Sequence, residues 1–206
     1  MWHVRVVFCN GIFLGLALIL SGQVSGAETM TSEQRRPCVT AQACFQSRDL
    51  SALVTQFPDS IWASRARFLI GTQLIEHGDP AGRSSLENLS DKLPLVADYI
   101  QWFLAQSYFT EGDFKQAALA YRLVTQHFQE SPLARRARYF EGLSWYRFGD
   151  CRSAVISLTG VFDGHQEPAN ADSGLRPASG FYLADCYLKR EKRKDAADIL
   201  WRIWTD

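Results

Sequence analysis

The sequence repeats a helix-stop signal at nearly constant spacing, and this repetition limits the fold more than any other feature. A Gly-Asp pair occurs at Gly78, Gly112 and Gly149, at intervals of 34 and 37 residues. Glycine readily adopts the left-handed conformation that ends a helix, and an aspartate directly after it can cap the next helix. Each pair therefore predicts a turn between two antiparallel helices. Proline, which is tolerated in the first turn of a helix, marks the expected helix starts at Pro58, Pro94, Pro132 and Pro177.

Side-chain size follows the same order in every copy of this frame. A small residue lies seven positions before each turn, and a large residue follows three positions later. The next helix contains an alanine, a large residue four positions on and an aliphatic residue three further on. Small residues allow two helices to approach closely, and large residues fill the adjoining space. The small positions are Gly71, Ala105, Gly142 and Ala184, and the alanines of the second helices are Ala117, Ala154 and Ala196, with Gly82 in a slipped first copy.

This pattern resembles the tetratricopeptide repeat, which has two antiparallel helices in about 34 residues. The resemblance implies an all-α fold, a right-handed solenoid of helix hairpins, with about four copies in residues 51–206. An unrelated helical bundle is the alternative. Residues 163–175 are rich in glycine, asparagine and other loop formers, and an insertion between repeats is expected at the rim of a solenoid.

The frame also identifies the first-helix residues that would line the concave side of the solenoid. One row of this side is aromatic in all four copies, and a second row lies two turns further on. Flat rings can stack on sugar rings or on a peptide, and arginine binds carboxylates. The alternative is that a tightly curved solenoid packs these rings against one another as core. The candidates are Phe68, Trp102, Tyr139 and Phe181 in the first row, Phe109 and Tyr146 in the second, and Arg136 and Arg147 beside them.

The first 27 residues are typical of a cleaved signal peptide. Arg5 precedes an apolar run over residues 12–20, and small residues at Ser25 and Ala27 suit cleavage after Ala27. The run is shorter than the roughly 20 residues that a membrane-spanning helix needs, and no cysteine follows it as a lipid attachment site would require. We therefore predict export to the periplasm without a stable membrane anchor.

Export changes the meaning of the cysteines. After loss of Cys9 with the signal peptide, four remain, Cys38 and Cys44 in the segment of residues 28–50 and Cys151 and Cys186 in the repeats. An even number in an oxidising compartment permits two disulfides. Of the three possible pairings, Cys38 with Cys44 and Cys151 with Cys186 is one, and buried reduced thiols at Cys151 and Cys186 are the alternative.

The sequence contains no motif for catalysis, a metal or a cofactor. It has no phosphate-binding loop, no nucleophile elbow and no metal-ligand spacing. Its 22 basic residues are balanced by 22 acidic ones, which argues against a nucleic-acid partner because such proteins need excess positive charge. We therefore expect a binding or scaffolding module.

Three local strings resemble the N-terminal helical superhelix of the periplasmic soluble lytic transglycosylases. They are residues 93–99 (LPLVADY), 127–134 (HFQESPLA) and 200–206 (LWRIWTD). The resemblance implies a non-catalytic region that holds a peptidoglycan strand or positions a catalytic domain. That family's catalytic glutamate lies in a Glu-Ser pair with a Gly-Leu-Met-Gln-like string downstream. Glu130-Ser131 lacks that string, so no catalytic residue is assigned.

A periplasmic tetratricopeptide adaptor that binds protein or peptide partners in envelope assembly is the alternative function. The two functions differ in ligand, a glycan strand in the first and a polypeptide in the second. The last copy ends in Trp201, Ile203 and Trp204 without a polar capping helix. Because solenoids normally close with an atypical terminal unit, we expect that the chain is the front part of a longer polypeptide.

Overall fold

The structure is a computed structural model in which residues 39–46, 48–164 and 174–205 are described. These residues lie in the second of two compact units of the chain, Cys38–Asp206. All regular structure within the described ranges is helical. The predicted signal peptide over residues 1–27, Cys38 and most of the predicted loop over residues 163–175 lie outside the described residues.

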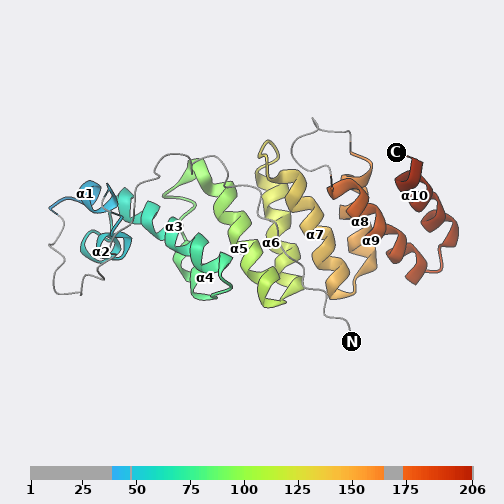
Figure 1. The fold of residues 1–206 in the computed structure, drawn as a ribbon, viewed down its shortest axis with the longest axis horizontal. Helices are drawn as coiled ribbons and strands as arrows, with labels where there is room; N and C mark the ends of the chain where they lie inside the picture. Colours follow the sequence, from blue (N-terminus) through green and yellow to red (C-terminus); the bar gives the residue numbers. More distant parts are fainter. Residues whose placement is uncertain (1–38, 47, 165–173, 206) are drawn as a thin grey trace, which may run out of the picture. The chain divides into compact units, whose positions relative to one another are not determined.

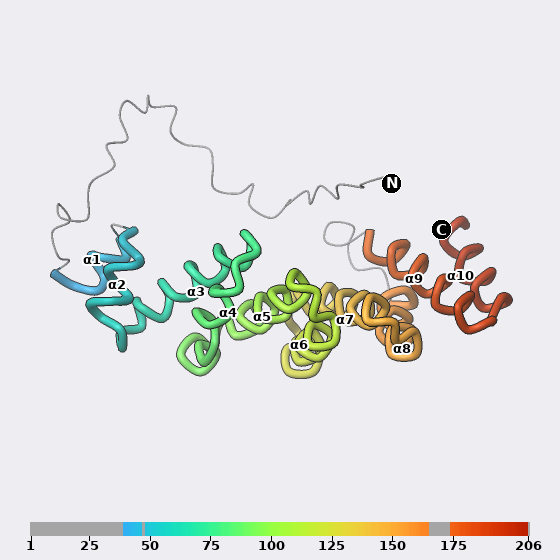
Figure 2. The backbone as a smooth tube through the Cα atoms, turned by 90° about the horizontal axis from the view of Figure 1, so that it is seen from below, coloured from blue at the N-terminus to red at the C-terminus, as the bar shows by residue number. Residues whose placement is uncertain are grey.

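The helices follow one another in chain order, from α1 in blue to α10 in red (Figures 1 and 2). Each helix packs against its neighbour in the sequence, as successive antiparallel hairpins require. Their bounds are α1 Ala41–Gln46, α2 Leu50–Gln56, α3 Ile61–Glu76, α4 Ala81–Leu86, a 3-10 turn η2 at Pro94–Val96, α5 Ala97–Glu111, α6 Phe114–His127, α7 Ala134–Phe148, α8 Cys151–Phe162, α9 Leu175–Lys189 and α10 Arg193–Thr205.

The predicted turns are confirmed by backbone geometry. Gly78, Gly112 and Gly149 have φ values of 76°, 83° and 93°, in the left-handed region that glycine enters without steric cost. Asp113 and Asp150 then cap α6 and α8 by accepting hydrogen bonds from backbone N–H groups, at 3.2 Å from Gln116 and 3.1 Å from Ser153. At these two turns the signal that we identified therefore ends one helix and starts the next. At the first turn α4 begins at Ala81, after Pro80, and the Asp79 carboxylate accepts a hydrogen bond from the Ala81 N–H at 2.9 Å.

The two helices of a hairpin approach most closely at the predicted small residues. A Cβ atom added to Gly82 of α4 would lie 2.6 Å from the carbonyl oxygen of Gly71 in α3. A Cβ atom on Gly142 of α7 would lie 2.6 Å from the Cγ atom of Leu158 in α8. Ala105, at the same place in the second copy, is fully buried. These positions hold small residues because the neighbouring helix fills the space that a side chain would need.

The first helices of successive hairpins share one face of the solenoid. Besides contacts between chain neighbours, α3 contacts α5 and α7 contacts α9. We call this side of the molecule the inner face. The pair α1 and α2 precedes the four copies, and the boundary that we predicted at Ser51 lies one residue inside α2. The helix starts at Leu50 because the Asp49 carboxylate accepts a hydrogen bond from the Ala52 N–H, at 3.1 Å.

Substitution of Gly112 by valine tests the turn geometry. Nothing lies within 4 Å of a Cβ atom at this position, so the cost comes from the backbone conformation alone. A β-branched residue is disfavoured there, and we expect the free energy of unfolding to fall by about 1–2 kcal/mol. Urea unfolding measures the loss, and Gly112→Asn should lose less because asparagine tolerates this region. A Gly112→Val protein as stable as wild type would contradict the turn assignment.

Candidate interaction surface

The first predicted aromatic row divides into buried and exposed rings. Trp102 and Tyr139 are 9% and 8% exposed, Phe68 is half-buried, and Phe181 is 58% exposed. The Trp102 ring packs edge-on against Phe140, with the ring centroids 5.5 Å apart, and Phe68 packs against Phe103 at 6.4 Å. Trp102 and Tyr139 thus belong to the core between hairpins, the alternative that we considered for this row.

A further, largely aromatic row, not predicted from the sequence, lies one position after the first row on each first helix. This row holds Phe103, Phe140 and Tyr182, with Leu69 in the first copy. Phe103 packs against Phe68 of the preceding copy, and Phe140 packs against Trp102. The sequence does contain a signal for this row, because an aromatic residue directly follows the first-row residue in three of the four copies. The described chain has no further first helix that could place such a ring on Phe181.

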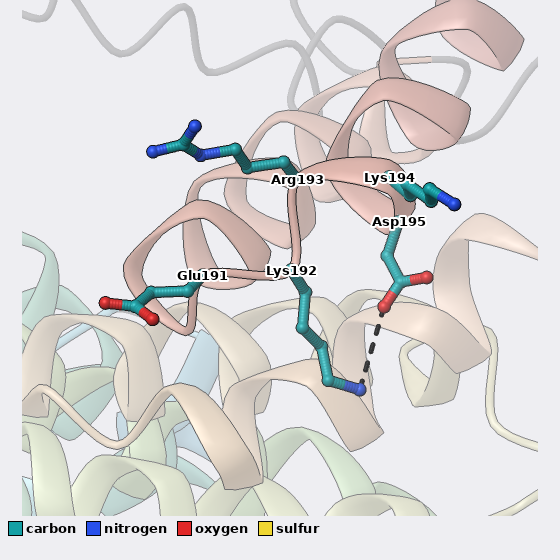
Figure 3. Close-up of a pocket in the computed structure, with 5 residues that line it drawn as sticks. All are labelled: Glu191, Lys192, Arg193, Lys194 and Asp195. Carbon is teal, nitrogen blue, oxygen red and sulfur yellow. Dashed lines mark ion pairs between the residues drawn. The ribbon is translucent and has the colours of Figure 1, made fainter.

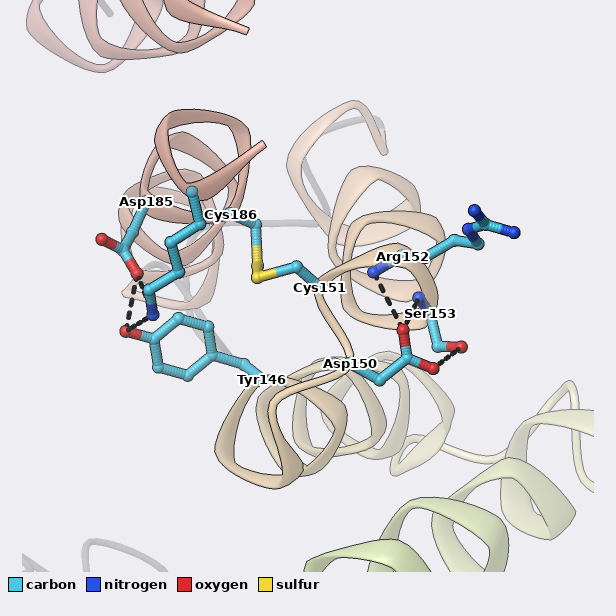
Figure 4. The surroundings of a disulfide bond; sticks show 8 residues. Tyr146, Asp150, Cys151, Arg152, Ser153, Asp185 and Cys186 are labelled. Atoms are coloured by element: carbon cyan, nitrogen blue, oxygen red, sulfur yellow. Dashed lines mark hydrogen bonds and ion pairs between the residues drawn. A yellow bond between two sulfur atoms is a disulfide. The ribbon is translucent and has the colours of Figure 1, made fainter. Parts of the chain in front are cut away.

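Three aromatic and charged side chains form a network on the inner face of α7 and α9. The Tyr146 hydroxyl donates a hydrogen bond to the Asp185 carboxylate at 2.8 Å (Figure 4). The Lys189 ammonium lies 2.7 Å from the same carboxylate. The ammonium also donates to the Tyr146 oxygen at 3.3 Å. The Tyr182 ring packs beside Tyr146, with the ring centroids 4.8 Å apart. These contacts fix the orientation of the Tyr146 ring.

The contacts in this network shift the pKa values of Asp185 and Lys189 in directions that favour their charged forms. Hydrogen bonds from Lys189 and then Tyr146 lower the pKa of the Asp185 carboxyl. The same pairing raises the pKa of Lys189. Both shifts favour the charged forms, so the network presents one carboxylate and one ammonium in fixed positions.

Exposed side chains surround this network and complete the candidate surface. Phe181 lies one turn before Asp185 on α9, and Leu188 lies just after it, so the three share a side of the helix. Phe181 and Leu188 are more than half exposed, and Arg147 is exposed next to Tyr146. We use the term α7–α9 surface for Tyr146, Arg147, Tyr182, Asp185 and Lys189 with Phe181 and Leu188.

The remaining predicted site residues lie away from this surface or inside the core. Phe109 is half-buried and packs against Phe114 and Phe140, with centroid distances of 5.5 Å to each. Arg136 is half-buried, and its charge offsets part of the burial effect that raises the pKa of Tyr121. Glu130-Ser131 lies between α6 and α7, where the Ser131 hydroxyl donates to Asp98 at 2.6 Å.

A disulfide joins the third hairpin to the fourth beside this surface. It connects Cys151 at the start of α8 with Cys186 in α9, and their Cα atoms are 5.2 Å apart (Figure 4). The bond lies next to Asp185, so it restrains α9 where that helix presents the α7–α9 surface. In α1, Cys44 is buried and disulfide-bonded.

Other features of the described residues do not suggest a chemical site. One pocket lies at the turn between α9 and α10 and is lined by five consecutive charged residues, 191–195 (Figure 3). The ion pair within it joins Lys192 to Asp195 at 3.6 Å. No cluster of three potential metal ligands occurs in the ranges that the structure describes. None of the described helices is long and apolar enough to cross a membrane.

Comparison with known proteins identifies the fold. No family model and no curated protein matches this chain. Two crystal structures of a Podosopora anserina putative kinesin light chain with nearly identical TPR-like repeats do match. Each is 16% identical to this chain, covers 79% of it and 89% of its own length, and has a TM-score of 0.56. The fold is a tetratricopeptide-like solenoid. At this identity the likeness establishes the fold alone.

The disulfide should contribute measurably to stability. It closes a loop with a sequence separation of 35 residues, for which restriction of the unfolded chain predicts about 2–4 kcal/mol. We expect Cys151→Ser and the double variant with Cys186→Ser to lose the same amount in urea unfolding, because either change removes the bond. Wild-type stability in both variants would show that the bond contributes nothing to folding.

Alkaline pH should weaken the packing around Tyr139. Burial, followed by the neighbouring Tyr182, raises the pKa of Tyr139 to about 12, whereas an unfolded tyrosine has a pKa of about 10. Between these two pH values the folded state retains a proton that the unfolded state loses. Tyr139 therefore leaves the free energy of unfolding unchanged below about pH 10. Towards pH 12 it lowers this free energy by up to about 2–3 kcal/mol.

Urea unfolding at several pH values from 9 to 12, in the Tyr139→Phe variant and wild type, measures this effect. The variant cannot ionise at this position and should lose less stability with rising pH. Tyr99→Phe is the matched control because Tyr99 is 40% exposed. If the free energy of unfolding fell equally with pH in wild type and Tyr139→Phe, Tyr139 would not be the source of the alkaline destabilisation.

Proposed function

We propose that this chain is a non-catalytic helical scaffold of the periplasm that binds a polypeptide partner on the α7–α9 surface. The observation on which this rests is the combination of exposed apolar side chains with a fixed ionic network. Phe181 and Leu188 provide apolar contact area, and the Tyr146–Asp185–Lys189 network provides hydrogen-bonding groups in set positions. A preorganised surface loses less conformational entropy on binding than a mobile one.

The charges of this surface favour a partner with a free carboxylate. Asp185 is already paired with Lys189, whereas Arg147 makes no ion pair with any residue that the structure describes. A guanidinium group binds a carboxylate through two parallel hydrogen bonds. We therefore infer that Arg147 binds an acidic side chain or a chain terminus of the partner, and that an apolar side chain of the partner packs on Phe181.

The scaffold of a soluble lytic transglycosylase, binding a peptidoglycan strand, is the second candidate function. Two observations favour it, the three sequence strings that resemble that family and the exposed Phe181 ring, on which a sugar could stack. Trp102 is a poor probe of this function because its ring is buried between hairpins. Phe181 is the better probe.

Binding experiments with the same set of variants discriminate between the two functions. Immobilised chain is incubated with a periplasmic extract, and purified peptidoglycan sacculi are sedimented with soluble chain. Phe181→Ala and Arg147→Glu should each reduce partner retention roughly tenfold, about 1.4 kcal/mol. Ile156→Ala is the matched control, because this residue is 73% exposed on α8 and does not belong to the α7–α9 surface.

Each outcome has a separate meaning. Retention of a protein that is lost in Phe181→Ala and Arg147→Glu, and kept in the control, supports the adaptor function. Saturable binding to sacculi that is lost in Phe181→Ala supports the glycan function. Partners retained equally by all variants would show that the α7–α9 surface is not the binding site.

A further inference from the structure

The side of α7 that faces away from the α7–α9 surface forms a second surface together with α6 and α8. Arg138 precedes Arg147 by about two and a half helical turns, so the two side chains point to opposite sides of α7. On the side of Arg138, the Arg122 guanidinium of α6 lies over the Trp145 ring, 5.7 Å from its centroid. A Cβ atom on Gly160 of α8 would lie 3.1 Å from the Arg138 side chain. The three helices therefore meet here.

We use the term outer α6–α8 surface for the apolar and basic side chains on this side. They are Lys115, Leu119, Arg122 and Leu123 of α6, Arg138 and Phe148 of α7, and Arg152 and Ile156 of α8.

The apolar side chains of the outer α6–α8 surface are open to solvent. Leu119 and Leu123 are 39% and 41% exposed, Phe148 is 52% exposed, and Ile156 is 73% exposed. Phe148 is linked to α6 by the Lys115 ammonium, which lies 6.0 Å from its ring centroid. Both neighbours of this surface are in place, because α5 packs on α6 and α9 packs on α8. Apolar residues gathered on one face in this way mark an interaction site more often than scattered ones do.

The repeat frame does not require apolar residues at these places. Leu119 and Ile156 each lie two positions after the small residue of their second helix. The same position holds Ser84 in α4 and Asp198 in α10, and both are exposed. An exposed aliphatic residue here is therefore particular to α6 and α8 among the described copies.

Positive charge surrounds these apolar side chains. Neither α6 nor α8 contains an aspartate or a glutamate. The one acidic residue of α7 is Glu141, and it pairs with Arg122 at 2.8 Å. Lys115, Arg138 and Arg152 form no ion pair within the ranges that the structure describes. Three cations of this surface are thus available to an anionic partner.

The carboxylates in the adjoining turns are already bound to the helices. Asp113 accepts a hydrogen bond from the Gln116 N–H at 3.2 Å, and Asp150 accepts one from the Ser153 N–H at 3.1 Å. The whole sequence has equal numbers of acidic and basic residues. The excess of positive charge on α6, α7 and α8 is therefore a local feature of this part of the chain.

We propose that the outer α6–α8 surface docks on a membrane of anionic phospholipids. Leu119 and Ile156 would enter the boundary between headgroups and acyl chains, and the cations beside them would bind headgroup phosphates. Charge complementarity favours this occupant, because a lipid surface offers many phosphates and needs no fixed spacing of the cations that bind it. The contact is peripheral and reversible. The α7–α9 surface lies on the opposite side of α7 and stays open, so the proposal does not depend on the partner assigned to it.

Sedimentation of the full chain with lipid vesicles tests the proposal. Wild type should bind vesicles that contain phosphatidylglycerol, bind poorly to vesicles of phosphatidylcholine alone, and dissociate as salt screens the exposed charges. Lys115→Glu and Arg152→Glu should each lower the partition coefficient at least about fivefold. Lys92→Glu is the matched control, because Lys92 is exposed in the turn after α4 and lies outside this surface. It should bind as wild type does.

A second pair of variants tests the apolar contribution. Ile156→Ser should lower the partition coefficient roughly threefold, since binding at the lipid interface scales with the apolar area buried. Ile61→Ser should leave it unchanged, because Ile61 is 45% exposed at the start of α3, away from this surface. Circular dichroism of each variant verifies that the helices remain folded.

Three outcomes would overturn the proposal. The first is a wild-type chain that does not bind phosphatidylglycerol vesicles. The second is equal binding by wild type, Lys115→Glu and Arg152→Glu. Every variant has the same N-terminus, so lipid binding by the segment before residue 39 would give this result. The third is a periplasmic protein that wild type retains and Lys115→Glu loses, without vesicle binding, which would assign the surface to an acidic protein.

Discussion

The close approach of two helices at small residues is the constraint on which the rest of this structure depends. At Gly82 and Gly142 the neighbouring helix occupies the space where a Cβ atom would stand. Because dispersion contacts fall off steeply with distance, a hairpin with larger residues there would lose packing along its whole length. The small residues also set where the large ones lie, since each ring extends beyond the point of closest approach. The glycine turns only connect helices that this packing has already placed.

Contact between hairpins is the second level of organisation, and it uses aromatic rings. A ring of one first helix packs on a ring from the next first helix, as Phe68 does on Phe103 and Trp102 on Phe140. Edge-on ring pairs of this kind add to the stabilisation by burial. The same residue type therefore serves as core in the middle of the solenoid and as surface at α9, where Phe181 is exposed. Among the described hairpins, a ring of the first row is covered where the next first helix supplies a second ring, as Phe103 and Phe140 do.

The sequence was sufficient to predict the hairpins because each is encoded locally. Gly112 and Gly149 are separated by one repeat, and their left-handed conformation depends on residues only a few positions away. The turn after α9 was harder to recognise because Glu191, not glycine, adopts a positive φ of 61° there. Contacts between hairpins could be predicted less well. The burial of Trp102 depends on Phe140, which is 38 positions further along the chain, and nothing in the period itself indicates which of two adjacent aromatic residues points inward.

The candidate surface lies at a junction where the repeats differ in their polar residues. Tyr146, Asp185 and Lys189 occupy frame positions that hold other residue types in the earlier copies, so their network is specific to α7 and α9. The Cys151–Cys186 disulfide occurs at the same junction and restrains the helix that bears two members of the network. Repetition alone would give every junction the same surface, and a ligand could then bind in several registers. Under the proposed function, the polar groups of this junction give a partner's carboxylate and apolar side chain one register on the described repeats.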